Sequence, residues 1–403
     1  MTVYVAAARF HEPCVVPARI ARHVVYRAAP HRRPRPLSTT QPSSKANRAD
    51  ESCVRIGALA PLSPPGWVEA GRHLLAGLEL AVRDVNHTGG IDGRPLELIV
   101  RDTAADPRKA EAAVDELARL GVDALAGEYH SVVARAAAAR ADALRVPFLC
   151  SSAVLDTLTE ARTDWVARLP PAQSRGWRIY AEYLFRTGHR RIAVAIAPSV
   201  YWEAGTRILR DYFEPNGGTV YEFDTGSMSP ATICEALVGR DATALLLLVG
   251  YPEPAVSLVK SVRRDQRLTK LLIGAPAGQP EFREWAALLG EDGASMPFLR
   301  YMPTHLTPIG SRVEAALRDR LGGAPSFVAF EGYDTITVLA AALREPRARG
   351  TAFWSDIAVE GTRGTISFSR TPGISVWQWA WPQVQVVDRD RANPDRWRIL
   401  DAG

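Results

Sequence analysis

The hydrophobic positions alternate between short continuous apolar runs and longer stretches in which apolar residues recur every three or four positions. A continuous run such as Val54–Ala60 predicts a strand that is buried on both faces. The spacing within Glu69–Asn86 predicts an amphipathic helix, which Gly89-Gly90 ends. Because strands buried on both faces belong to parallel sheets covered by helices, this pattern predicts an α/β fold.

The alternation continues in the next hundred or so residues. Asp106-Pro107 supplies an N-cap and a proline at the first helical position, which predicts a helix to about Leu120. The other elements expected here are strands at Leu96–Val100, Ala124–Ala126 and Val146–Cys150, and an alanine-rich helix at Ser131–Leu144.

The same pattern restarts further along the chain, which predicts a second doubly wound unit. Its expected helices are Ser174–Arg186, Tyr201–Tyr212 and Pro254–Arg264, and its expected strands are Arg191–Ala197, Thr219–Phe223, Ala244–Gly250 and Leu271–Gly274. A last stretch has helices expected near Pro308–Leu321 and Phe327–Arg344, followed by β-rich segments at Thr365–Ser369, Ile374–Trp379 and Val384–Val387.

The positive charge of the chain is concentrated near its start. The 403 residues include 49 Lys and Arg against 44 Asp and Glu, a formal net charge of +5. Residues 1–53 hold nine of the basic and three of the acidic residues, so the remainder has 40 basic and 41 acidic residues. We therefore expect no nucleic-acid binding by the body, and a disordered basic tail over residues 1–53, where prolines interrupt any pattern.

Targeting and membrane signals are weak. Runs such as Ala244–Gly250 are far shorter than the roughly eighteen residues that cross a bilayer, so no transmembrane segment is expected. The apolar stretch Val3–Ala8 is too short for a secretory signal peptide, and a transit peptide or a dispensable extension are the alternatives for the tail. The four cysteines lack C-x-x-C spacing, so neither a zinc site nor a disulfide framework is expected.

Catalytic motifs are absent from the sequence. It contains no G-x-G-x-x-G, Walker loop, H-E-x-x-H or G-x-S-x-G, and its eight histidines are scattered. We therefore expect no enzymatic activity, no cofactor and no metal. An enzyme built on a doubly wound sheet is the alternative from a different class, and turnover of a bound ligand would support it.

Polar and aromatic residues follow the predicted strands, at the sheet edge where open α/β sheets bind ligands. In the first unit, Tyr129 and Ser131 follow one strand, and Ser152 and Val154 follow the next. Ser131 also begins a predicted helix, where its hydroxyl and the free N–H groups of the first turn can bind a carboxylate or carbonyl oxygen.

The second unit has aromatic residues at the equivalent places. Tyr201 and Tyr251 each stand just beyond a buried strand, where a phenol can stack on a ligand and hydrogen-bond to it. Trp67 and Trp202 would suit a flat or aromatic ligand if they face the cleft; the alternative is that they pack against the lobes.

The order of elements and several short segments resemble the leucine/isoleucine/valine-binding family of ABC-transporter solute receptors, which have the type I periplasmic-binding-protein fold. The resemblance covers about Val54 to Asp388. It is carried by Ile56-Gly57, Pro61-Leu62-Ser63, Gly77-Leu78-Glu79-Leu80-Ala81, Asn86, Gly89-Gly90-Ile91, Gly93-Arg94-Pro95-Leu96, Arg101-Asp102 and Asp106-Pro107. A cytoplasmic amide sensor of the same fold is also similar, at Tyr129-His130-Ser131 and Ala141-Asp142-Ala143-Leu144.

The resemblance implies two doubly wound parallel-sheet lobes joined by a three-crossover hinge, with crossovers near Pro170–Gln173, Met302–Thr307 and Arg370–Gly373. Residues 54–171 and 305–370 would form the first lobe, and 172–304 and 371–395 the second. The implied function is capture of a small polar organic molecule between the lobes and its delivery to an ABC permease. The alternative is a cytoplasmic sensor with a regulatory protein as partner. The resemblance implies a location outside the cytoplasm, whereas the missing signal peptide favours the cytoplasm.

The resemblance also assigns roles to the candidate site residues. Ser131 would bind the ligand carboxylate, Ser152 and Val154 would add backbone and hydroxyl contacts, and Tyr201 and Tyr251 would contribute from the second lobe. We therefore expect these residues to line one cleft.

Two positions depart from the pattern of amino-acid-binding relatives. Val154 stands where a hydroxyl residue is usual, and Pro276 stands where an acid holds the ligand ammonium group. A buried ammonium without a partner costs several kcal/mol, which argues against an ordinary α-amino acid. Glu128 or Glu331 could substitute for the missing acid. The candidate ligands are therefore amino-acid-like molecules, amides, ureas and aromatic acids.

Overall fold

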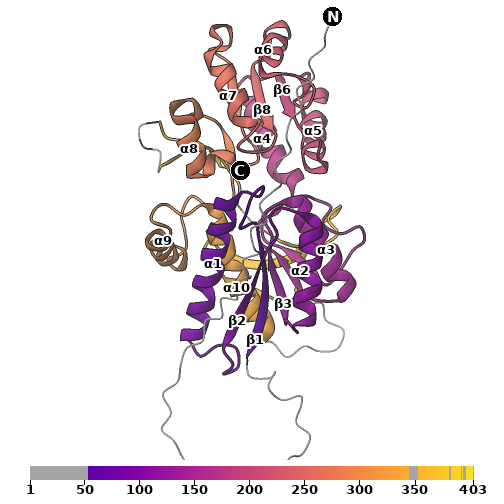
Figure 1. Ribbon diagram of the computed structural model, residues 1–403, viewed down its shortest axis with the longest axis vertical. Helices are drawn as coiled ribbons and strands as arrows, with labels where there is room; N and C mark the ends of the chain where they lie inside the picture. Colours follow the sequence, from indigo (N-terminus) through magenta and orange to yellow (C-terminus); the bar gives the residue numbers. More distant parts are fainter. Residues whose placement is uncertain (1–52, 345–352, 381–382, 392, 394–395, 403) are drawn as a thin grey trace, which may run out of the picture.

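The computed structural model describes residues 53–344, 353–380, 383–391, 393 and 396–402. Apart from Cys53, the basic tail expected at residues 1–53 lies outside the described residues. Two lobes follow one another along the long axis of the molecule (Figure 1). One lobe is built on an eight-stranded sheet and the other on a four-stranded sheet, which confirms the predicted α/β class with two parallel-sheet units.

The sheet of the first lobe is parallel over six of its eight strands. Its spatial order is β11-β12-β13-β5-β4-β3-β1-β2, and its antiparallel pairs are β11 with β12 and β12 with β13. The strands are β1 (Val54–Ala60), β2 (Leu96–Asp102), β3 (Ala124–Gly127), β4 (Phe148–Cys150), β5 (Val166–Arg168), β11 (Ala358–Glu360), β12 (Thr365–Arg370) and β13 (Trp377–Trp379).

Helices cover both faces of this sheet (Figure 1). They are α1 (Val68–His87), α2 (Pro107–Arg119), α3 (Ser131–Leu144), α9 (Pro308–Leu321) and α10 (Phe327–Arg344). The helices α1 and α10 pack together on one face, and α2 and α3 pack together on the other. Glycines allow α1 and α10 to approach closely: a Cβ added at Gly77 would lie 1.9 Å from the Ala329 carbonyl oxygen.

The second lobe has a wholly parallel sheet in the order β7-β6-β8-β9. Its strands are β6 (Arg191–Ile196), β7 (Thr219–Asp224), β8 (Ala244–Leu248) and β9 (Leu272–Gly274). Its helices are α4 (Gln173–Arg186), α5 (Val200–Phe213), α6 (Pro230–Gly239), α7 (Ala255–Arg264) and α8 (Arg283–Leu289). A small antiparallel sheet of β10 (Phe298–Arg300), β14 (Gln385–Arg389) and β15 (Trp397–Ala402) packs beside α4. Within the described ranges, no helix is both long and apolar enough to span a membrane.

The chain passes between the lobes three times, after β5, after β10 and after β13. The last passage differs from the expected one at Arg370–Gly373. The strand β13 still pairs in parallel with β5, through Trp377 opposite Ala167 and Gln378 opposite Arg168. The strand β13 lies between β12 and the parallel strand β5, so it belongs to the sheet of the first lobe. The chain therefore leaves the first lobe only after Trp379.

Candidate ligand-binding site

A pocket of about 450 Å³ lies between the lobes. Its walls are loops that follow β1, β3 and β4 in the first lobe and β6, β8 and β9 in the second. In both sheets the strand order reverses direction next to the first strand, between β1 and β3 and between β6 and β8. Open α/β sheets bind ligands at these switch points, beyond the carboxyl ends of the strands.

All but one of the predicted site residues line this pocket. They are Trp67, Tyr129, Ser131, Ser152, Val154, Tyr201, Trp202 and Tyr251. The strand-end rule brings them together although they are spread over almost two hundred residues of sequence.

Pro276 is the exception, and its neighbour Ala277 lines the pocket in its place. The Gly278 N–H donates to the Ala275 carbonyl at 3.0 Å, which closes a tight turn after β9. Gly278 has a φ of +91°, a left-handed conformation that glycine adopts without strain. This turn directs Ala277 to the cavity and leaves Pro276 buried in the second lobe.

The Ser131 hydroxyl is held by the loop after β4. Its Oγ accepts from the backbone N–H groups of Val154 at 3.2 Å and Leu155 at 3.3 Å. Because the oxygen is used as an acceptor, the hydroxyl proton remains available to the pocket. The preceding residue, His130, gives α3 no side-chain cap, and Val132 and Val133 of the first turn also line the cavity. The uncapped positive end of α3 therefore opens on the pocket.

Aromatic rings make up much of the remaining wall. Trp67 lies 5.6 Å from Tyr129 in its own lobe and 5.8 Å from Tyr251 in the other, measured between ring centroids. In the second lobe, Tyr201 and Trp202 are 4.6 Å apart. Burial raises the pKa of Tyr129 well above that of a free phenol, so this side chain remains a neutral hydrogen-bond donor at physiological pH.

Two further aromatic residues of the pocket were not predicted from the sequence. Tyr301 follows β10 in the second passage between the lobes, and Phe327 is the first residue of α10. Their ring centroids are 5.2 Å apart. Neither follows a strand of the two parallel sheets, so the strand-end rule does not identify them; the three-residue strand β10 before Tyr301 was itself not predicted.

The candidate acids lie in different places. The Glu128 carboxylate is buried and accepts from the Thr103 hydroxyl at 2.8 Å and from the N–H groups of Tyr129 and His130 at 2.9 and 3.1 Å. It is not part of the pocket lining. The acid that does line the described pocket is Glu253, an exposed residue of the loop after β8. No Lys or Arg side chain is among the described residues that line it.

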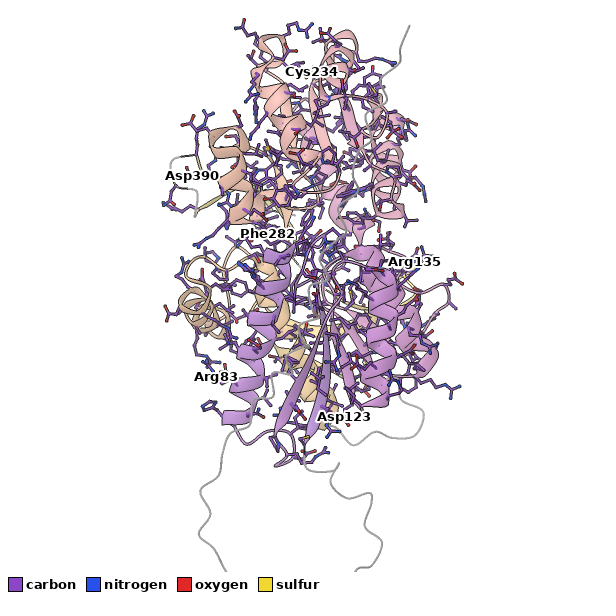
Figure 2. All side chains as sticks on the ribbon, in the orientation of Figure 1. Arg83, Asp123, Arg135, Cys234, Phe282 and Asp390 are labelled. Carbon is purple, nitrogen blue, oxygen red and sulfur yellow. The ribbon has the colours of Figure 1, made fainter. Side chains whose placement is uncertain are left out.

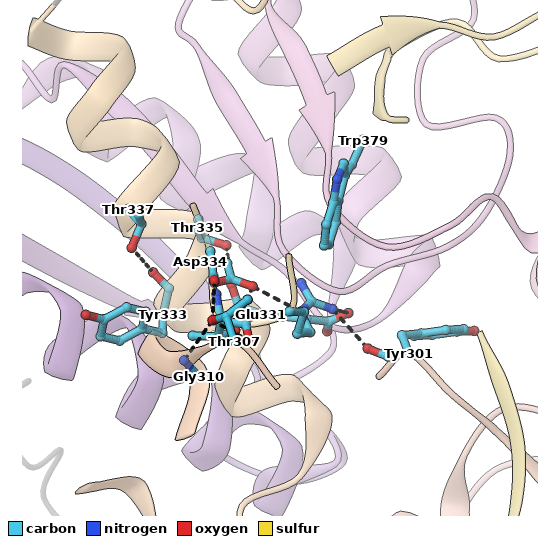
Figure 3. Close-up of polar contacts among 12 residues, drawn as sticks. Tyr301, Thr307, Gly310, Glu331, Tyr333, Asp334, Thr335, Thr337 and Trp379 are labelled. Carbon is cyan, nitrogen blue, oxygen red and sulfur yellow. Dashed lines mark hydrogen bonds and ion pairs between the residues drawn. The ribbon is translucent and has the colours of Figure 1, made fainter. Parts of the chain in front are cut away.

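Glu331 lies behind the pocket wall, on α10. The Ser152 hydroxyl donates a hydrogen bond to its carboxyl group, and Arg363 Nη1 lies 3.4 Å from its other oxygen. Desolvation raises the pKa of Glu331 to about 8, against the opposing effect of Arg363. Figure 3 shows Glu331 and Asp334 close together, with Tyr301 and Trp379 nearby. Among the described residues that line the pocket, Ser152 is the one that hydrogen-bonds to the Glu331 side chain.

The lobes also touch beside the pocket. The Glu69 carboxylate of α1 accepts from the backbone N–H groups of Arg283 at 2.9 Å and Glu284 at 3.0 Å, at the start of α8 in the other lobe. Phe282 lies at the boundary between the lobes (Figure 2), with its ring centroid 6.1 Å from that of Trp67 and 6.0 Å from that of Tyr129. We call this set of contacts the Glu69 clasp.

A pocket enclosed by loops from two doubly wound lobes is the mark of a bilobal ligand-binding protein. The family model for periplasmic binding proteins matches residues 53–373, and the chain therefore belongs to the periplasmic binding protein family. Members of this family are solute receptors rather than enzymes.

Curated relatives include a Leu/Ile/Val-binding protein homolog of Brucella suis, which is 28% identical over 217 residues. That alignment covers 54% of this chain and 49% of the relative. The Leu/Ile/Val-binding protein of Escherichia coli is 24% identical over 180 residues, covering 44% of this chain and 49% of the relative. The chain thus spans about half the length of the curated relatives it matches.

Solved structures share the fold over nearly their whole length. The isoleucine complex of the branched-chain amino acid transporter substrate-binding protein LivJ from Streptococcus pneumoniae superposes with a TM-score of 0.74 at 19% identity, covering 87% of this chain and 100% of that one. A solute-binding protein of an ABC transporter from Rhodopseudomonas palustris, in complex with 3,4-dihydroxybenzoic acid, gives 0.71 at 19% identity, covering 87% and 97%. The fold is therefore that of the type I periplasmic binding proteins.

Proposed function

We propose that this protein is the solute receptor of an ABC transporter and that it holds a small aromatic carboxylate in the pocket between its lobes. The observation that carries this proposal is the combination of an aromatic wall with the uncapped start of α3 and the Ser131 hydroxyl.

The carboxylate would bind at the start of α3. The free N–H groups of a first helical turn and an available serine proton are neutral donors that together favour an anion. Hydrogen bonds to a charged group contribute about 1.5 to 3 kcal/mol each, more than bonds between neutral groups. A few such bonds and the enclosure of an apolar ring would support micromolar binding, which corresponds to about −8 kcal/mol.

The body of the ligand would lie between the aromatic side chains. Trp67 and Tyr129 come from the first lobe, and Tyr201, Trp202 and Tyr251 come from the second. A flat ring can stack on or meet the edge of several of these rings at once, with gains of about 0.5 to 1.5 kcal/mol for each pair beyond the buried area.

An α-amino acid fits the pocket less well. Its ammonium group requires an acid within the enclosed part of the site, and the place expected to supply one has Ala277 at the cavity and Pro276 behind it. Glu128 is already occupied by three hydrogen bonds, and Glu253 is exposed. These features favour an acid without an amino group.

The comparisons support transport as the role. The Rhodopseudomonas palustris receptors bind aromatic acids, namely 3,4-dihydroxybenzoic acid, benzoate and p-hydroxybenzoic acid, whereas the Streptococcus pneumoniae receptor binds isoleucine. The three Rhodopseudomonas palustris proteins are solute-binding proteins of ABC transporters, and the Streptococcus pneumoniae protein is a transporter substrate-binding protein. None of them supports the alternative of a cytoplasmic regulator.

The test is a ligand screen by thermal shift and calorimetry with benzoate, the hydroxybenzoates, leucine, isoleucine, phenylalanine, amides and ureas. We expect aromatic acids to raise the melting temperature and amino acids to have little effect. Ser131→Ala should weaken the binding of benzoate by about tenfold to a hundredfold, the value of one or more charge-assisted hydrogen bonds. Tyr201→Ala should also weaken it.

Ser229→Ala is the matched control, because Ser229 caps α6 and is not among the residues that line the pocket. It should lower stability slightly and leave affinity unchanged. Tight binding of isoleucine with no response to aromatic acids would refute the proposed ligand class. Delivery is tested separately, by whether the loaded receptor stimulates the ATPase activity of a reconstituted permease from the same organism.

A further inference from the structure

The polar cluster behind Ser152 contains two carboxyl groups and one guanidinium group. Glu331, Asp334 and Arg363 are each at most 5% exposed. Two buried carboxylates beside one cation would leave an uncompensated negative charge, which is strongly unfavourable in an apolar interior. One of the two acids therefore carries a proton in part of the physiological pH range.

The hydrogen bonds identify which acid that is. Asp334 accepts from the Thr362 N–H at 2.6 Å, from the Thr362 hydroxyl at 2.9 Å and from Arg363 Nε at 3.0 Å, all of which stabilise its ionised form. Within the described part of the chain, the Glu331 carboxyl group has only Ser152 and the more distant Arg363 as partners. Burial raises the pKa of Asp334 as well, but Arg363 and the two Thr362 hydrogen bonds oppose that rise. Asp334 is thus the ionised partner of Arg363, and Glu331 is the group that takes up the proton, in keeping with its pKa of about 8.

The protonation state of Glu331 has a direct effect on Ser152. A carboxylate can only accept, so the Ser152 proton points to it and Ser152 has only lone pairs for the pocket. A carboxylic acid can donate to Ser152, which frees the Ser152 proton to point into the pocket. Ser152 lines the cavity and contacts Glu331 at the same time.

We infer that Glu331 sets the hydrogen-bonding polarity of Ser152, so that the ionised form selects ligands with an O–H or N–H donor beside it and the protonated form selects ligands with an acceptor. This inference rests on the proposed function, because it refines the class of aromatic carboxylate to hydroxylated ones when Glu331 is ionised. Glu331 is a positioning residue, acting through Ser152.

The other groups around Glu331 do not offer an alternative switch. Where α1 crosses α10, it presents Leu74 and Gly77. The titratable residues of α1 near α10 are His73, which contacts Ser326 and has a pKa lowered to about 4, and Asp84, which accepts from the Tyr333 hydroxyl. The remaining titratable neighbours are Asp334 on α10, Arg363 before β12, Tyr301 after β10, Tyr129 after β3 and Cys150 on β4. Burial raises the pKa of Tyr129 and Tyr301 well above 10 and that of Cys150 to about 12, so they remain neutral between pH 6 and 9.

The experiment compares the affinities of benzoate and of 2-, 3- and 4-hydroxybenzoate for the full chain at pH 6.5 and pH 8.5. We expect the preference for the best hydroxybenzoate over benzoate to rise about fivefold with pH, since a hydrogen bond within a charged network is stronger than a neutral one. Glu331→Gln, a neutral mimic of similar shape, should remove the rise, and so should Ser152→Ala. Glu182→Gln, which removes an exposed carboxylate of α4, should keep it.

Calorimetry in two buffers of different ionisation enthalpy gives a second measurement on the unaltered protein. Binding of the hydroxybenzoate near pH 7.5 should release a proton, whereas binding of benzoate should release less. A preference that does not change with pH, or that persists in Glu331→Gln, overturns this inference and leaves the proposed function intact. Failure of all four acids to bind overturns the proposed function and the inference with it.

Discussion

Burial changes the acid–base chemistry of individual side chains in this protein. The pKa of Glu331 is raised from 4.5 to about 8, chiefly because its charged form loses hydration. His73 is shifted the other way: desolvation lowers its pKa to about 4, and its Nδ1 accepts from the Ser326 N–H at 2.9 Å. The two shifts act on stability in opposite directions.

Glu331 is expected to make stability fall as pH rises. Between the unfolded and folded pKa values, the folded protein holds a proton that the unfolded chain has released, so raising the pH favours unfolding. Protonation of His73 in the unfolded chain makes stability rise with pH below pH 6.5. The effect of Glu331 on stability is therefore measured between pH 6.5 and 8. The free energy of unfolding by urea should fall by on the order of 2 kcal/mol across this window. Glu331→Gln should remove most of that fall, and an identical slope in the variant would contradict the assignment.

The sequence predicts the site best at the level of single residues. Ser131, Tyr201 and Tyr251 were found because each follows a buried strand, and the strand-end rule needs only the strand boundaries. Tyr301 and Phe327 were missed because the folding of the hinge places them at the pocket, and no local sequence pattern indicates that position. The predicted site position Pro276 is one residue before Ala277, which lines the cavity, because the turn that ends at Gly278 decides which side chain faces it.

At the level of elements, the crossing of α1 and α10 is the tightest contact in the first lobe. A Cβ at Gly77 would meet the Ala329 carbonyl oxygen at 1.9 Å, and one at Gly332 would meet the Leu74 carbonyl oxygen at 2.3 Å. Both obstacles are backbone atoms of a helix, so neither can move without separating the helices.

Gly77→Ala should therefore destabilise the protein strongly, even though alanine is the better helix former. We expect a loss of at least about 3 kcal/mol in the free energy of unfolding, at the upper end for overpacked cores. Gly239→Ala at the end of α6 is the control, because its added methyl group meets nothing within 4 Å. Chemical denaturation of both variants decides the point, and equal stabilities would mean that the helices can move apart at little cost.

The elements that the sequence predicted are those with long, regular patterns. The bounds of β1, α3, α9 and α10 agree with the structure, because continuous apolar runs or repeated helical spacing define them. The three-residue strands β5, β10 and β11 were missed, whereas β4, β9 and β13, which are equally short, lie inside longer predicted segments. The strand β15, which has no fully buried residue, and the seven-residue helix α8 were also missed. The helix α6 was missed as well, and it buries only Ile233, Cys234 and Leu237.

At the level of the whole molecule, the Glu69 clasp ties the lobes together beside the pocket. One carboxylate satisfies two backbone N–H groups at the start of α8, as an N-cap would, although it belongs to the other lobe. Opening the lobes must break both hydrogen bonds and expose part of Phe282.

Glu69→Ala should therefore shift the molecule towards open forms. Loss of a cap costs about 1 to 2 kcal/mol, so the affinity for the tightest ligand should fall about tenfold, mainly through faster dissociation. Small-angle scattering without ligand should show a larger radius of gyration than for the unaltered protein. Glu314→Ala removes an exposed carboxylate on α9 and should change neither quantity. An unchanged dissociation rate in Glu69→Ala would show that the clasp plays no part in closure.

The three passages of the chain between the lobes have a mechanical consequence. A single tether would let one lobe rotate freely against the other, and two would still permit a twist. With three, after β5, β10 and β13, sliding and torsion are both restrained, and a bend about one axis is the easiest motion left. For a receptor that closes by such a bend, as proposed for this protein, the two halves of the pocket would meet in the same alignment at every closure, and its selectivity would be the same each time.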